Sequence, residues 1–316
     1  MFLLRIVFLT LIFTASFVGP YKAFFNSHSQ KSFIEIMPGD SMYLVISRLT
    51  SESFLNKLFF RIYVNKNNIR LFQAGEYNIT EMSIANAIDS FKKGNTITRF
   101  ITINEGMNIF DLNKIIDNSY LINDCINLNC LTINYPFVEG VLHPDTYFYK
   151  KGMKASDILV DSHKSLDLKL SELWKKKPNA NLLKNKYEAL ILASIIEKEA
   201  GNHFEKKDIA SVFLKRISLG MKLQADPTII YGLLPDFDGD IKKSDILDKN
   251  NRYNTYMIKG LPPTPISIVS ISSLEAAITS SPGDYLFFVA NSPTTHHFSK
   301  TYEEHKQMIK KIGLDR

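Results

Sequence analysis

Two glutamates near the end of one apolar helix are the residues best suited to acid–base chemistry. The segment YEALILASIIEKEAG, residues 187 to 201, has apolar side chains around most of its circumference, as a helix buried in a domain centre does, and Gly201 predicts its end. The apolar environment of Glu197 predicts a raised pKa, which a general acid needs. Glu199 points to nearly the opposite side and is almost as good a candidate. The alternative is that Glu197 belongs to a structural ion pair.

The length and composition predict a folded protein of about two domains. The chain has 316 residues, of which 45% are hydrophobic and 22% charged, and this is enough to bury a sizeable core. Its net charge of +6 comes from Lys and Arg scattered throughout, without a dense basic block or a nucleic-acid-binding motif. We therefore expect no nucleic acid partner, whereas the mild positive charge is compatible with an anionic membrane surface.

The N-terminal segment, residues 1 to 25, is expected to be a membrane anchor. Residues 6 to 19 form an uncharged apolar run flanked by Arg5 and Lys22, and a helix of roughly 20 such residues spans a bilayer. We expect a single transmembrane helix, with the rest of the chain outside the cytoplasm. The alternative is a cleaved signal peptide, since small residues within the run offer a cleavage site.

The part of the chain after the anchor predicts a small α+β module. Residues 33 to 49 and 100 to 116 share the pattern of a strand, a glycine turn and a helix, which is a weak internal repeat. An Asn-rich, irregular stretch from 118 to 135 predicts a domain boundary. We therefore expect a first domain over residues 33 to 135 and a second over residues 136 to 316.

Local signals predict several elements of the second domain. A short strand is expected at 221 to 224, followed by a helix with Asp226 as its N-cap, a role that explains this acid without any function. Ser272 and Thr301 are each followed by a Glu three residues later, so both predict a capping box. The apolar run 285 to 290 predicts a buried strand.

The sequence predicts neither a metal site nor a cofactor. Cys125 and Cys130 have no nearby His, so they do not suggest zinc, although a disulfide closing a small loop is possible outside the cytoplasm. Three histidines near the C-terminus lack the spacing of metal ligands. They are His296, His297 and His305.

Five motifs follow one another along the chain. They are EGVLHPDTYFY (139 to 149), ASIIEKE (193 to 199), LQADPTIIYGL (223 to 233), YNTYMIKGLPPTPI (253 to 266) and HHFSKTYEEH (296 to 305). Together they resemble the YceG-like endolytic murein transglycosylases, the MltG family. The resemblance covers nearly the whole chain after the anchor, and it implies a LysM-like glycan-binding first domain and a mixed α/β YceG catalytic domain. It also implies that the catalytic acid is the Glu of the ASIxE motif, Glu197.

The resemblance implies cleavage of peptidoglycan strands by a lyase reaction. One Glu can protonate the glycosidic oxygen and then take the proton of the muramyl C6 hydroxyl, which closes a 1,6-anhydro ring. Other motif residues are expected to stabilise the developing charge or to line the sugar subsites. The candidates for substrate binding are Glu139, Asp145, Tyr147, Gln224, Asp226, Tyr231, Asn254, Thr255, Tyr256 and His296.

The resemblance further implies a location and partners. We expect a single-pass protein of the bacterial inner (cytoplasmic) membrane with its catalytic domain on the periplasmic side, acting on nascent glycan strands and meeting peptidoglycan synthases. Two other functions remain open at this point. One is a membrane-tethered glycan-binding scaffold without catalysis, and the other is a hydrolase in which Asp226 activates water.

Overall fold

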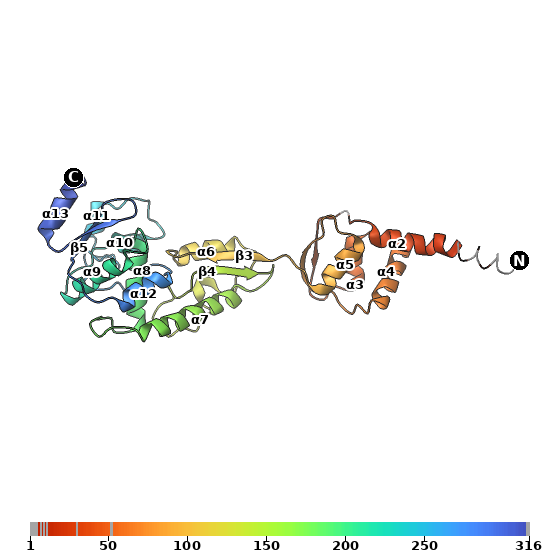
Figure 1. Ribbon diagram of the computed structural model, residues 1–316, viewed down its shortest axis with the longest axis horizontal. Coiled ribbons are helices and arrows are strands. Elements are labelled where there is room, and N and C mark those ends of the chain that lie inside the picture. Colours follow the sequence, from red (N-terminus) through yellow and green to blue (C-terminus); the bar gives the residue numbers. More distant parts are fainter. Residues whose placement is uncertain are drawn as a thin grey trace. The chain divides into compact units, whose positions relative to one another are not determined.

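The computed structural model describes residues 6, 8, 10, 12–29, 31–50 and 53–313 (Figure 1). It has a mixed α+β fold, as the sequence predicts.

The chain divides into two compact units. Unit 1 comprises Met1–Arg99 and Phe148–Gly152, and unit 2 comprises Phe100–Tyr147 and Met153–Arg316. Residues 100 to 135, which the sequence analysis grouped with the first domain, therefore belong to unit 2.

Unit 1 combines a two-stranded antiparallel sheet with short helices. Its strands pair over their whole length, from Phe33 opposite Asn78 to Ile36 opposite Gly75. Three of its helices begin directly after a serine whose hydroxyl accepts a backbone N–H of the first turn, because this bond satisfies a donor that the helix itself leaves free. The elements are a π-helical segment (Thr14–Val18), α2 (Gly19–Asn26), β1 (Phe33–Ile36), α3 (Met42–Leu49), α4 (Phe54–Lys66), β2 (Gly75–Asn78) and α5 (Ile84–Lys93).

Aromatic side chains make up much of the core of unit 1. Tyr77 and Phe91 are fully buried, and their rings meet edge to face with centroids 4.8 Å apart. Phe59 and Phe60 of α4 are also buried in this core.

Unit 2 contains most of the helices. In its first part a disulfide joins Cys125 to Cys130. Two strands cross the boundary between the units, since the first residue of β3 and the last two of β4 belong to unit 1. The elements are β3 (Arg99–Ile103), α6 (Ile109–Asp117), a 3-10 turn (Ile126–Leu128), β4 (Asp145–Tyr149), α7 (Ala155–Trp174), α8 (Lys186–Glu199), α9 (Lys206–Ser218), α10 (Asp226–Leu233), α11 (Lys243–Leu247), α12 (Ile271–Thr279), β5 (Phe287–Ala290), β6 (His296–Ser299) and α13 (Tyr302–Lys311).

Helix α8 forms the centre of the core of unit 2. Every residue from 189 to 196 is buried, as the all-round apolar sequence predicts. It packs against α7, α9, α10 and α12, which lie around it in Figure 1. The end of this helix is therefore held by several elements at once.

Some local predictions are confirmed and others are wrong. The two repeat copies each fold as strand, turn and helix, and Thr301 opens a capping box. No strand forms at 221 to 224, and Ser270, not Ser272, is the N-cap of α12. The strand expected over 285 to 290 begins only at Phe287 and is partly exposed, because it pairs with β6 alone in a two-stranded sheet.

The expected anchor lies partly outside the described residues. Within them, no helix is long and apolar enough to cross a membrane. Those described between residues 6 and 13 are helical.

Because each unit has its own core, we expect damage to one core to stay local. Phe91→Ala empties a fully buried site in unit 1 and should cost that unit about 3–5 kcal/mol of unfolding free energy. Hydrogen exchange of the full chain should then accelerate in α3, α4 and α5, with the amides of α8 and α9 unchanged. The matched variant Phe213→Ala should have the reverse effect. Equal acceleration in both units from either variant would mean that the chain has one cooperative core.

Candidate active site

The last turn of α8 carries Glu197 and Glu199. At the other end of the helix, the side chain of Asn185 is the N-cap and accepts the backbone N–H of Glu188 at 2.9 Å. Because α8 is buried along most of its length, the backbone of both glutamates is held in a fixed position. Their surroundings differ, and the difference decides what each can do.

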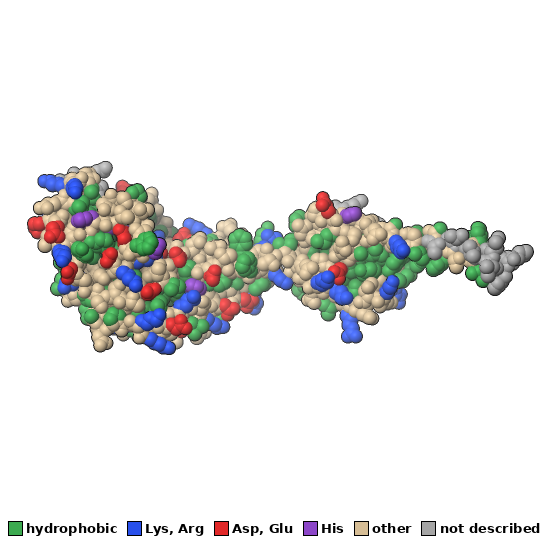
Figure 2. Space-filling model, viewed as in Figure 1, with side chains coloured by type: hydrophobic (Ala, Val, Ile, Leu, Met, Phe, Trp, Pro, Cys, Tyr) green, Lys and Arg blue, Asp and Glu red, His purple; other side chains and the backbone are tan. Residues whose placement is uncertain are grey.

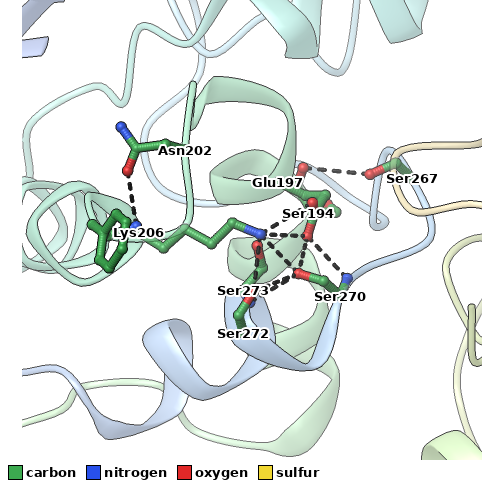
Figure 3. A network of polar contacts seen from close by, with 9 residues as sticks. Ser194, Glu197, Asn202, Lys206, Ser267, Ser270, Ser272 and Ser273 are labelled. Carbon is green, nitrogen blue, oxygen red and sulfur yellow. Dashed lines mark hydrogen bonds and ion pairs between the residues drawn. The ribbon is translucent and has the colours of Figure 1, made fainter. Parts of the chain in front are cut away.

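Glu197 lies in a polar network that links three helices. Its carboxylate accepts hydrogen bonds from the Ser270 amide at 2.9 Å and the Ser270 hydroxyl at 2.5 Å, and Lys206 Nζ lies 3.2 Å from its Oε1 (Figure 3). Lys206 also donates to the Ser270 and Ser272 hydroxyls, at 2.8 and 3.0 Å. The side chains of Glu197 and Lys206 are each only 9% exposed. The network thus joins α8, the start of α9 and the N-terminus of α12.

The expected raised pKa of Glu197 is wrong. Burial does raise its pKa, but the hydrogen bonds from Ser270 and the charge of Lys206 outweigh this effect, so the pKa lies below its usual value. Glu197 is therefore ionised at neutral pH and has no proton to donate. Its contact with Lys206 is that of a structural ion pair, which was the alternative interpretation from the sequence.

Glu199 has the environment that the sequence analysis expected for Glu197. Its pKa is raised to about 8, chiefly by burial and also by the carboxylate of Asp226, while the Arg216 guanidinium opposes both effects. The residue as a whole is half-buried. At neutral pH, Glu199 is mostly protonated and can donate a proton.

Asp226 lies close enough to Glu199 to influence its charge, and it is not a helix cap. The N-cap of α10 is Ala225, and Asp226 is the first helical residue, so the predicted capping role is wrong. Its Oδ1 accepts the hydroxyl of Tyr256 at 2.7 Å. Gln224, which is exposed, has the left-handed φ of 52°, a strained conformation for a residue with a side chain. Such strain tends to be kept at functional sites.

Glu139 and Tyr231 are brought together, but in the interior. The Tyr231 hydroxyl donates to Glu139 Oε2 at 2.8 Å, and the backbone N–H of Ile109 donates to the same oxygen at 3.1 Å. Glu139 is 5% exposed, and burial raises its pKa, with these hydrogen bonds opposing. The contacts fasten the start of α6 to α10, so Glu139 acts as a structural link in this structure.

Two other candidates, Asn254 and Thr255, are fully buried and hold the loop that carries Tyr256. The Asn254 amide donates to three carbonyl oxygens, those of Asp245, Ile246 and Asp248, at 2.9 to 3.0 Å. Thr255 accepts the Ala225 backbone N–H at 2.9 Å. They hold this loop in place from the interior.

The remaining candidates lie elsewhere in unit 2. Asp145 is exposed and lines a shallow cavity of about 360 Å³ beside β3. The Tyr147 hydroxyl donates to the His143 carbonyl at 2.8 Å. His296 is bound to Glu205, both through its backbone N–H at 2.7 Å and through its ring Nδ1 at 3.0 Å. Among the described residues, no hydrogen bond or ion pair joins these three to Glu199.

Sequence reasoning missed Arg216 and Lys206. Arg216 is 6% exposed and donates to the carbonyls of Leu286 at 2.8 Å and Leu223 at 2.6 Å, which holds the chain just before Asp226. A signal was present, because both cations fall on the apolar face of α9 at helical spacing from Ile209 and Phe213. A charge on a buried face indicates a partner in the interior.

Within the described residues, no group of three or more His, Cys, Asp or Glu side chains is placed to hold a metal ion. The site consists of a protonated carboxyl beside a second acid, held by a tyrosine and an arginine. A carboxyl group that keeps its proton beside a second acid is an arrangement used by enzymes that cleave glycosidic bonds.

Comparisons with known proteins agree with this class. The model of the YceG-like family matches residues 34–311. A Bacillus subtilis protein named endolytic murein transglycosylase is 30% identical over 88% of this chain and 84% of its own length. A Streptococcus pneumoniae protein of the same name is 25% identical over 80% of this chain and 53% of its own length. The crystal structure of a yceG-like protein from Listeria monocytogenes matches with a TM-score of 0.56 and 29% identity, over 87% of this chain and 98% of that one.

The chain therefore belongs to the YceG-like family.

The Glu197 network predicts that removing the negative charge of this side chain strongly lowers the free energy of unfolding. Glu197→Gln leaves Lys206 buried without its carboxylate, and breaking such a pair costs about 3–5 kcal/mol. The double variant Glu197→Gln/Lys206→Met leaves no buried charge and should recover part of this loss in urea unfolding. Because the pKa of Glu197 is lowered, its contribution is complete above about pH 4.3, the pKa of an unfolded Glu, and is lost as the pH falls. The difference in unfolding free energy between wild type and the single variant should therefore become smaller in acid. A single variant as stable as wild type at pH 7 would contradict this role of Glu197.

Proposed function

We propose that this chain is a lytic transglycosylase that cuts peptidoglycan strands internally. The bond cleaved lies between N-acetylmuramic acid and N-acetylglucosamine, and the product carries a 1,6-anhydro-muramyl end. Membership in the YceG-like family and the names of its relatives support the enzyme class.

The observation that carries the proposal is the environment of Glu199. Its pKa of about 8 keeps the proton on this carboxyl at neutral pH, as a general acid requires. Sequence reasoning assigned the acid to Glu197, and that assignment remains a prediction. We favour Glu199 because Glu197 is ionised and surrounded by its own partners, whereas the raised pKa of Glu199 keeps a proton on its carboxyl at neutral pH.

The reaction needs one proton carrier acting twice. Glu199 gives its proton to the glycosidic oxygen as the bond to muramyl C1 breaks, and the N-acetylglucosamine hydroxyl leaves. The resulting carboxylate then takes the proton of the muramyl C6 hydroxyl, whose oxygen bonds to C1. Glu199 is protonated again at the end, and no water is consumed. A nucleophilic or water-activating carboxylate is not required, because the sugar's own hydroxyl attacks.

Asp226 supplies a negative charge beside Glu199. In its ionised form it stabilises the positive charge that develops at C1 and favours the protonated form of Glu199. The Tyr256 hydroxyl fixes the orientation of this carboxylate through its 2.7 Å bond. Gln224, exposed two residues earlier, is available to bind a sugar hydroxyl.

The finer parts of the proposal concern location and partners. The apolar run of residues 6 to 19 anchors the chain in the cytoplasmic membrane, and unit 2 acts on its outer side. Unit 1 is a LysM-like module that binds glycan, and cleavage of nascent strands near the synthases ends their elongation. This arrangement is supported by the sequence pattern and by the family.

Glu199→Gln tests the chemistry, since it keeps the size of the side chain and removes the transferable proton. Formation of anhydro ends from purified peptidoglycan, followed by mass spectrometry, should fall by ~10² to 10⁴. Binding to glycan strands should be retained. Glu188→Gln, in the first turn of the same helix, is the matched control and should stay active.

The product spectrum separates this proposal from its alternatives. Wild-type protein that leaves strands intact would be a scaffold, and one that releases reducing ends would be a hydrolase. A well-folded Glu199→Gln protein that forms anhydro ends at the wild-type rate would show that another group supplies the proton.

A further inference from the structure

Helix α4 exposes large apolar side chains at its first turn, which unit 1 does not need for its core. Phe54 is 79% exposed and Leu55 is 53% exposed. Further along the same helix, Phe59, Phe60 and Val64 are buried. Figure 2 shows hydrophobic side chains gathered where α4 lies beside α2. An apolar patch of this kind usually marks an interaction surface.

Ring contacts place α4 at the end of the N-terminal apolar run. The Phe59 ring meets the Phe17 ring edge to face at 5.4 Å and the Tyr21 ring at 5.5 Å. One turn later in α4, Tyr63 stacks on Phe25 at 4.4 Å. The contacts therefore advance in the same direction along both helices.

This order of contacts locates the exposed turn. Phe17 belongs to the apolar run of residues 6 to 19. Phe54 and Leu55 precede Phe59 in α4 by more than one helical turn, on the side from which the apolar run arrives. If the run lies in a bilayer, this turn is at the level of its surface.

The charges of α4 follow the same order. Lys57 and Arg61 are exposed and one turn apart, beyond the apolar turn, and Lys22 is exposed on α2. A helix with apolar residues at one end and cations after them suits the boundary between acyl chains and anionic headgroups.

We propose that the first turn of α4 inserts into the lipid bilayer surface beside the anchor, so that unit 1 is held against the membrane by two contacts. The occupant of the patch is the phospholipid interface, with Phe54 and Leu55 among the acyl chains and Lys57 and Arg61 at the headgroups. The inference rests on the membrane anchor proposed above.

The test uses a tryptophan at position 54 of the full chain. The sequence has one tryptophan, Trp174, so Trp174→Phe provides a silent background. Phe54→Trp is compared with Leu71→Trp, which is 57% exposed and follows the C-terminal end of α4. Both proteins are reconstituted in vesicles of phosphatidylethanolamine and phosphatidylglycerol, with brominated lipids as quenchers.

The expected result is a blue shift and a loss of emission at position 54 when the bromines lie near the headgroups, with neither effect at position 71. Emission at position 54 as water-exposed as at position 71 would overturn the inference. A blue shift without quenching would also overturn it, because protein would then cover the patch.

An alkaline wash of the vesicles distinguishes this failure from failure of the anchor. Protein that stays in the membrane while position 54 faces water contradicts the α4 contact alone. Protein that washes off contradicts the anchor, and the inference fails with it.

Discussion

The rest of the site depends on the removal of the Glu199 carboxyl from water at the end of a buried helix. Desolvation disfavours its charged form, and the negative charge of Asp226 adds to this effect. Two residues earlier, Glu197 meets a lysine and a serine amide and stays ionised. One helical turn thus holds two carboxyl groups in opposite states, and such a separation of pKa values assigns acid and non-acid roles.

The Glu197 network holds the end of α8 in place, although burying Glu199 there is unfavourable. A buried ion pair adds little net stability, but it is strongly destabilising to break, so it fixes which groups meet. Here it joins the last turn of α8 to α9 and to the N-terminus of α12 (Figure 3). Arg216 acts in a similar way on the other side, since it fixes the backbone at Leu223, three residues before Asp226. The chain around both acids of the site is therefore held by cations, Lys206 on one side and Arg216 on the other.

Sequence patterns predicted the elements well and the environments poorly. The apolar circumference of α8 and the capping box at Thr301 depend on neighbours in sequence, so local patterns suffice. The choice between Glu197 and Glu199 depends on Lys206, Ser270 and Asp226, which come from other elements, and a helical wheel carries no such information. The same holds for Asn254, whose place in a family motif suggested a ligand contact and whose side chain binds three backbone carbonyls in the interior. The domain boundary was placed at a change in composition, whereas the units follow packing contacts.

The central claim is that Glu199, and not Glu197, holds a proton at neutral pH. A titration of side-chain carboxyl groups by NMR, on protein labelled with ¹³C at the glutamate carboxyl carbon, tests it most directly. Comparison with Glu199→Gln assigns the resonance. The account predicts that the resonance missing from this variant titrates near pH 8, as burial and Asp226 require. A Glu199 resonance that titrates near the ordinary value of about 4.3 would contradict the account.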